Sequence, residues 1–151
     1  MAMTHAIDSH LHDWIIHAYE YWGDKAVLVL HARSSDASSA RLADVVFEGV
    51  DGHHFEHVLD GNIVFDLREI DPEPFVASWS DLFARSLSYG FPCPRYSGSD
   101  VTTLPAYIRS RGLHCYALST SYGMYGFVIA NSCRIVDRGT RSDPATDSIA
   151  D

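Results

Sequence analysis

Residues 14–33 read WIIHAYEYWGDKAVLVLHAR, and this stretch decides the fold. Aromatic and β-branched residues dominate positions 14–22, and apolar residues return over positions 25–33. Gly23 and Asp24 separate the two runs and form a two-residue turn signal. Because strands favour the first residue types and turns favour Gly and Asp, the pattern predicts a β-hairpin.

Further elements are expected on the C-terminal side of this hairpin. Residues 41–50 and 62–67 predict two more strands. Asp71-Pro72-Glu73-Pro74 predicts a helix start, because Pro suits the first turn and acids complement the positive end of the helix dipole. The apolar stripe of that helix precedes a stop near Gly90 and comprises Phe75, Trp79, Leu82, Phe83 and Leu87. A short helix ending at Gly112 and a closing hairpin over 113–119 and 125–136 complete the pattern.

The order of these elements predicts an α+β fold. We expect a mainly antiparallel sheet of five to six strands, packed against one long and one short helix. Residues 1–136 would form a single domain, and residues 137–151 a flexible C-terminal tail with little to bury. No apolar run approaches the length of a membrane span, and no secretion signal is visible at the start. Cys93, Cys115 and Cys133 are odd in number, and we expect them to be reduced in a cytoplasmic protein.

The net charge of the 151-residue chain is −9, from 20 acidic and 11 basic residues. This acidity argues against nucleic-acid backbones and anionic membranes as direct partners. Ten of the acids lie between Asp44 and Asp81, where Arg68 is the one basic residue. Such a segment is either a solvated face or an acidic surface for a basic protein partner. For the second case the predicted contact residues are Asp44, Glu48, Asp51, Glu56, Asp60, Asp66, Glu69, Asp71 and Glu73.

Two histidine motifs offer a metal-binding alternative. Asp8-x-His10-x-His12 resembles the motif of amidohydrolase and TatD-type metal hydrolases, which implies a divalent metal held by His10 and His12. Those enzymes are (β/α)₈ barrels, which need more residues and helices than this chain offers. His53, His54 and His57 form a second cluster, which suits either a metal or a solvated loop.

Other catalytic patterns are absent from the sequence, which has no P-loop, no Gly-x-Ser-x-Gly and no dinucleotide-binding glycine motif. No cofactor is therefore expected. The sequence leaves enzymatic activity undecided and favours a role without catalysis.

The overall layout resembles small bacterial immunity proteins of polymorphic toxin systems and related domains of unknown function. The resembling parts are His12-Asp13 before the aromatic hairpin, residues 46–50, and a final hairpin with Ser121-Tyr122-Gly123 at its turn. The resemblance implies a cytosolic protein that binds and blocks a toxin without cofactor or catalysis. The leading hypothesis is thus an inhibitor that occludes a basic toxin or enzyme. The alternatives are the metal-dependent hydrolase and a structural or accessory protein, for example of a phage.

Overall fold

Strands dominate the computed structural model, which describes residues 5–6, 11–36 and 39–141. The described residues contain nine strands, three short α-helices and two short 3₁₀ turns. The strands are β1 (His5–Ala6), β2 (Ile15–Trp22), β3 (Val27–Arg33), β4 (Ala40–Glu48), β5 (Gly52–Glu56), β6 (Asn62–Ile70), β7 (His114–Tyr122), β8 (Tyr125–Ala130) and β9 (Ser132–Arg141). The helices are α1 (Pro72–Ser78), α2 (Ser80–Ser86) and α3 (Leu104–Ser110).

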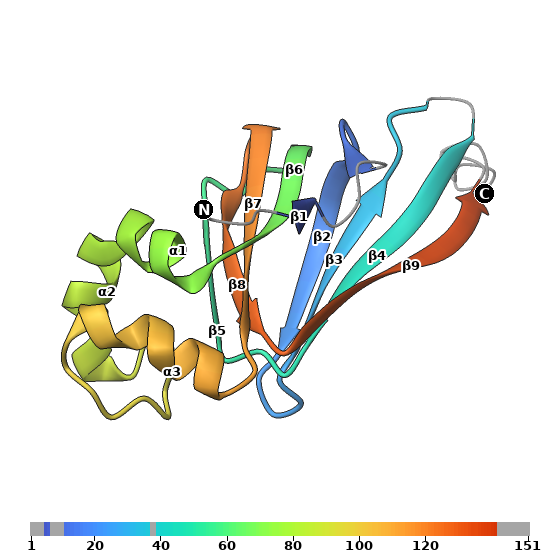
Figure 1. Cartoon of the computed structure of the whole chain (residues 1–151). Coiled ribbons are helices and arrows are strands. Elements are labelled where there is room, and N and C mark those ends of the chain that lie inside the picture. Colours follow the sequence, from blue (N-terminus) through green and yellow to red (C-terminus); the bar gives the residue numbers. More distant parts are fainter. Residues whose placement is uncertain (1–4, 7–10, 37–38, 142–151) are drawn as a thin grey trace.

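All strands join one antiparallel sheet in the order β5-β8-β7-β6-β2-β3-β4-β9, and β1 pairs with β6. The sheet bends so that its two halves converge at one end and splay apart at the other (Figure 1). At the converging end, the Asn131 N–H donates to the carbonyl of Glu48 at 3.0 Å. This contact joins the β8–β9 connection to the end of β4, so the bend is closed by backbone hydrogen bonds.

The main core lies between the inner faces of the two halves. In β3, Leu28, Leu30 and Ala32 alternate with more exposed residues and are buried. They belong to the same cluster as Phe47 of β4 and Val128 of β8. The period-two alternation of a strand therefore sets one face of β3 inward.

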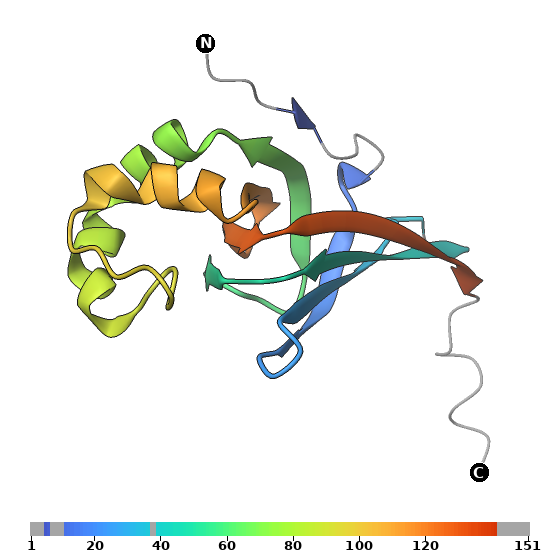
Figure 2. The same ribbon diagram turned by 60° about the horizontal axis from the view of Figure 1, so that its bottom comes forward.

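A second core lies between the helices and the outer face of β7 and β8, on one side of the molecule (Figures 1 and 2). Phe127 of β8 is fully buried and contacts Phe75 of α1 and Phe83 of α2, with ring centroids 5.0 and 5.6 Å apart. None of the helices in the described part of the chain has the length and apolar content that a membrane crossing requires.

The expected hairpin over residues 14–33 is confirmed, because β2 and β3 pair antiparallel from Ile15–Arg33 to Trp22–Val27. The connection between them is longer than the two-residue turn expected. It spans Gly23 to Ala26, and the Lys25 N–H donates to the Trp22 carbonyl at 3.1 Å.

The expected five to six strands packed on one long helix are wrong. Residues 52–56 form β5 rather than a loop, and the expected strand over 125–136 is two strands, β8 and β9, separated at Asn131. β8 pairs with β5 and β7, whereas β9 pairs with β4, because the chain crosses between the two halves of the sheet at this point. β9 runs on to Arg141, past the expected start of the tail at residue 137, and residues 142–151 lie outside the described part.

The expected long helix is also wrong, because it is interrupted at Trp79. The Ser78 hydroxyl donates to the Phe75 carbonyl at 2.8 Å, and the Trp79 N–H reaches the same oxygen at 3.3 Å. A side chain that competes for a helix carbonyl weakens the regular ladder at that turn. The interruption lets Phe75 and Phe83 approach Phe127 from two short helices, so tertiary packing overrides the helical pattern.

Candidate functional site

Part of β2 is one of the places where the structure leaves strand backbone open, together with the outer edges of β5 and β9. β2 pairs with β3 along its whole length, but with β6 only at Ile15 and Ile16. Within the described chain, the edge of β2 from residue 18 to residue 22 therefore has no ladder partner on the side away from β3. An edge of this kind presents backbone N–H and C=O groups that can pair with another chain.

β5 runs beside this open edge and contacts it through rings. Tyr19 lies against Phe55 with ring centroids 5.5 Å apart, and Tyr21 lies against His53 at 4.4 Å. As the residue number rises from 19 to 21 in β2, that of the contacted residue falls from 55 to 53 in β5, so the two strands run antiparallel. β5 pairs with β8 alone, so its edge on the other side is also unpaired. We call these four rings, Tyr19, Tyr21, His53 and Phe55, the aromatic seam.

Most of the exposed apolar side chains come from three segments. Among the described residues, seven large hydrophobic side chains are exposed, and all but Tyr89 come from β2, the β5–β6 loop or the end of β7. The six are Tyr19, Tyr21, Trp22, Val58, Leu59 and Tyr122, with exposed fractions of 40 to 55%. Scattered exposed hydrophobics are ordinary. Of the six, Tyr19 and Tyr21 are the two that lie in the aromatic seam, on one face of β2.

Asn62 brings these segments together from a buried position at the start of β6. Its Nδ2 donates to the carbonyls of Ile16 in β2 at 3.1 Å and of Leu59 in the loop at 2.8 Å. Its Oδ1 accepts from the N–H groups of Leu59 at 2.9 Å and of Met124, just beyond the β7–β8 turn, at 2.8 Å. One amide group thus fixes three segments that carry the exposed apolar side chains. A buried amide with all its partners in place holds such an arrangement rigidly.

The chain segments that flank the aromatic seam are acidic. Residues 19–25 and 56–60 carry four carboxylates, from Glu20, Asp24, Glu56 and Asp60, against the single Lys25. Lys25 lies over the Trp22 ring at 4.2 Å from its centroid. The Glu20 side chain is 51% exposed, so its charge faces solvent.

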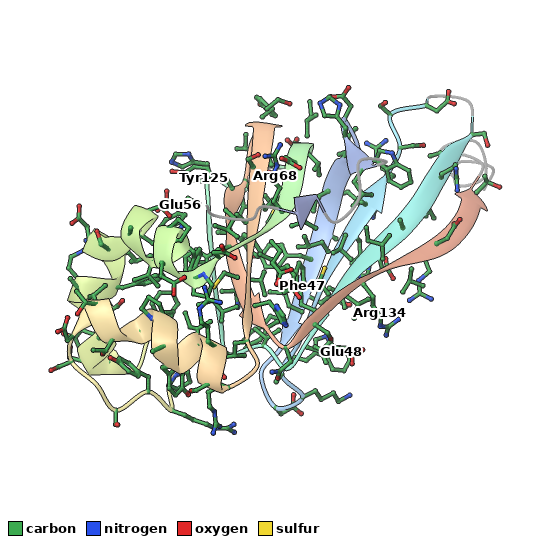
Figure 3. The ribbon with its side chains drawn as sticks, viewed as in Figure 1. Phe47, Glu48, Glu56, Arg68, Tyr125 and Arg134 are labelled. Atoms are coloured by element: carbon green, nitrogen blue, oxygen red, sulfur yellow. The ribbon has the colours of Figure 1, made fainter. Side chains whose placement is uncertain are left out.

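Two side chains of β5, Glu56 and His53, have shifted pKa values. Hydrogen bonds from the Tyr125 hydroxyl and from His54 hold the pKa of Glu56 below its usual range (Figure 3). Burial, together with the neighbouring His54, lowers the pKa of His53. The first shift keeps a negative charge on the face of β5 opposite the aromatic seam, and the second keeps the His53 imidazole neutral.

The structure distributes the nine predicted acidic residues over several faces. Asp44 and Glu48 lie on the outer face of β4, Asp51 in the β4–β5 connection, Asp66 and Glu69 on β6, and Asp71 and Glu73 at the start of α1. Glu56 is the last residue of β5 and points with His54 to the face opposite the aromatic seam, and Asp60 lies in the β5–β6 loop.

Several of these carboxylates already have cations from their own chain. Arg134 donates to Glu48 at 3.0 Å, as Figure 3 shows, and Arg109 donates to Glu73 at 3.0 Å. Arg68 pairs with Asp66, and His114 with Glu69. Asp51 differs, because its Oδ2 is enclosed and has no hydrogen-bond partner among the described residues. The acidic segment of the sequence is therefore not one acidic face.

A row of charged groups crosses the outer face of β2, β3, β4 and β9. His31 contacts Glu20 through Nε2 at 3.1 Å and Asp44 through Nδ1 at 2.8 Å, and Arg138 donates to Asp44 at 2.7 Å. Burial alone would lower the pKa of His31, but the bonds to Asp44 and Glu20 outweigh it and the pKa is raised. Both ring nitrogens are engaged, so this imidazole is a charge partner and has no free nitrogen for acid–base catalysis.

The described residues of the histidine motifs do not converge on a metal site. Asp8 and His10 lie outside the described residues, and His12 contacts Asp13 at 3.1 Å. His53 contacts Tyr21 on one face of β5, whereas His54 packs against Trp79 on the opposite face. The part of the chain that the structure describes contains no group of three His, Cys, Asp or Glu side chains placed to hold a metal ion.

The cysteines are likewise unsuited to nucleophilic chemistry. All three are free, and burial raises the pKa of each thiol, most strongly for Cys93 and Cys115. A thiol held protonated is a poor nucleophile and metal ligand. These cysteines therefore act as small hydrophobic side chains, as expected from the sequence.

The aromatic seam was not predicted as a site from the sequence. The composition of residues 14–22 indicates a strand, but it does not say which of its residues face solvent. Phe47 and Phe75, in and next to the acidic segment, are buried and offer no contact surface. The available signal was the aromatic content of residues 19–22, which is unusual for an exposed strand.

Comparison of the chain with protein-family models, with curated proteins and with solved structures finds no match.

Proposed function

We propose that this protein is a binding module that docks a basic protein on the aromatic seam and blocks it by occlusion, as an immunity or inhibitor protein does. The single observation that supports this most is the open edge of β2, which carries two exposed tyrosines, Tyr19 and Tyr21, on its inner face. Tyrosine is among the residue types that dominate the binding energy of protein interfaces.

Charge supports the choice of a basic partner. The chain carries a net charge of −9, which attracts a basic protein at long range and speeds its association. At short range, Glu20 provides negative charge on the open β2 strand, and Asp60 lies in the β5–β6 loop. Of the predicted acidic residues, we propose Asp60 as a contact residue, whereas the others contribute to the long-range field.

The proposal places the protein in the cytoplasm. Its three cysteines are unpaired, and free buried thiols suit a reducing compartment.

Capture of partners by immobilised protein, followed by mass spectrometry, tests the proposal. The critical comparison is between the wild-type chain, a Tyr21→Ala/Tyr122→Ala variant and a Tyr89→Ala control, since Tyr89 is exposed away from the aromatic seam. We expect the wild type and the control to retain the same basic protein, and the double variant to lose about tenfold or more in affinity. Added salt should slow association.

Occlusion is tested by the activity of the captured partner. Stoichiometric wild-type protein should inhibit it, and the double variant should inhibit it only at much higher concentration. Equal capture and equal inhibition by the wild type and the double variant would refute the proposal.

A further inference from the structure

The backbone around the aromatic seam resembles a sheet from which one strand is missing. Along β2 the unpaired edge runs from residue 18 to residue 22, and β5 presents its own unpaired edge from residue 52 to residue 56. The rings of the seam connect these strands, and no backbone hydrogen bond between them is found in the described chain. A further strand would therefore find open N–H and C=O groups here.

Side chains on β2 alternate between two chemically different faces. Tyr19 and Tyr21 are paired in register with Leu30 and Leu28, whose side chains enter the core, so both tyrosines lie on the inner face with the aromatic seam. Glu20 points to the opposite, outer face, where it contacts His31 at 3.1 Å. A strand added beside β2 would meet aromatic rings at alternate positions and a carboxylate between them.

Resting on the proposed function, we propose that the partner docks by adding a β-strand to the open edge of β2. The strand that fits is extended and has apolar or aromatic side chains on the face toward Tyr19 and Tyr21. Its other face carries Arg or Lys toward Glu20. Backbone pairing supplies affinity and the alternating side chains supply specificity, as in other strand-addition complexes. The inward face excludes charged side chains because the rings there leave them without a partner.

Synthetic peptides of about ten residues serve as the probe, because this length matches one strand. In these peptides, basic residues alternate with Val, Ile or Tyr. Each parent peptide is compared with two N-methylated versions, one methylated at the odd-numbered backbone nitrogens and one at the even-numbered ones. A version methylated only at its two ends is the control. Binding is measured by calorimetry and by amide chemical shifts over residues 18–22 and 52–56.

The expected result is binding of the parent peptide, with a loss of about tenfold or more for at least one methylated register and a change within about twofold for the end-methylated control. Glu20→Lys should weaken the same peptide, and Asp81→Lys, an equal charge change on exposed α2, should not. The amide shifts should move at the β2 edge.

Strand addition is overturned if the peptides fail to bind, or if both methylated registers bind as tightly as the parent. The proposed function survives that outcome as long as the captured protein still depends on Tyr21 and Tyr122. Conversely, loss of that dependence removes the proposed function whatever the peptides do, so the two failures are distinguishable.

Discussion

Replacement of Asn62 by alanine tests the central polar contact of this fold. The substitution removes four hydrogen bonds at once, which join Ile16, Leu59 and Met124 to a single side chain. The Ile16 carbonyl and the Met124 N–H are buried, so both are left without a partner. Each buried group left without a partner costs about 1–3 kcal/mol. The two bonds to Leu59 add less, because the loop is exposed and water can replace them. We expect the free energy of unfolding to fall by about 2–5 kcal/mol.

Urea denaturation followed by circular dichroism measures this loss, and Asn131→Ala is the matched control. Asn131 also donates to two carbonyls, those of Gly112 at 3.0 Å and Arg111 at 3.3 Å, but it is exposed. Water can replace its bonds, so the control should lose less than about 1 kcal/mol. A similar small loss for both variants would refute the role assigned to Asn62.

Asn62→Asp refines the test, because it keeps the acceptor and removes the donor. A buried carboxylate beside the carbonyls of Ile16 and Leu59 has a raised pKa in the folded state. A raised folded pKa gives stability that is present at low pH and lost as pH rises. We therefore expect this variant to be closest to wild-type stability in acid, with the gap widening toward neutral pH. A gap that is independent of pH would contradict the burial of this site.

Three further predictions concern other parts of the fold. Phe127→Ala should lower the free energy of unfolding by about 3–5 kcal/mol in urea titrations, because the ring is fully buried, whereas Tyr89→Ala should change it by less than about 0.5 kcal/mol. Gly52→Ala should cost about 1–3 kcal/mol by the same measure, since an added Cβ would overlap a backbone carbonyl. The His31–Asp44 pair gives stability that fades as pH rises through the raised pKa of His31, above 6.5, and as pH falls through the lowered pKa of Asp44, below 3.8. Melting temperatures of wild type and His31→Gln should accordingly differ most between those limits and converge outside them.

Local signals predicted the elements whose cause is local. The β2–β3 hairpin follows from residue types on either side of a Gly-Asp break. The inward face of β3 does not follow in this way, because Val27 to Leu30 are apolar without alternation. The break at Trp79 was not predictable in the same way. No Gly or Pro stands there, and the cause is packing against Phe127, nearly fifty residues away. β5 was missed because five residues between two turn signals form a strand only when β8 provides the pairing.

The acidic segment shows why a charge cluster in sequence need not be a surface in space. Successive strand residues point to opposite faces, so neighbouring acids separate on folding. Arg134 and Arg138 belong to β9, yet they bind Glu48 and Asp44, which precede them by 86 and 94 residues. Sequence counting gives the net charge of the segment and contains no information on these distant partners. It could therefore predict the long-range attraction to a basic protein but not the contact surface.

The open edge and the stability of the fold depend on the same residue. Asn62 is the first residue of β6 and pairs with Ile16, where the β2–β6 ladder ends. At the same point its side chain donates a hydrogen bond to the Ile16 carbonyl. The chain before it turns away through Leu59 under the control of the same amide group. If β6 continued along β2, residues 18–22 would be covered and the aromatic seam would have no free backbone. The contact that stabilises this corner of the sheet is therefore also the contact that keeps the proposed docking edge open, so loss of Asn62 should weaken partner binding beyond the effect of unfolding alone.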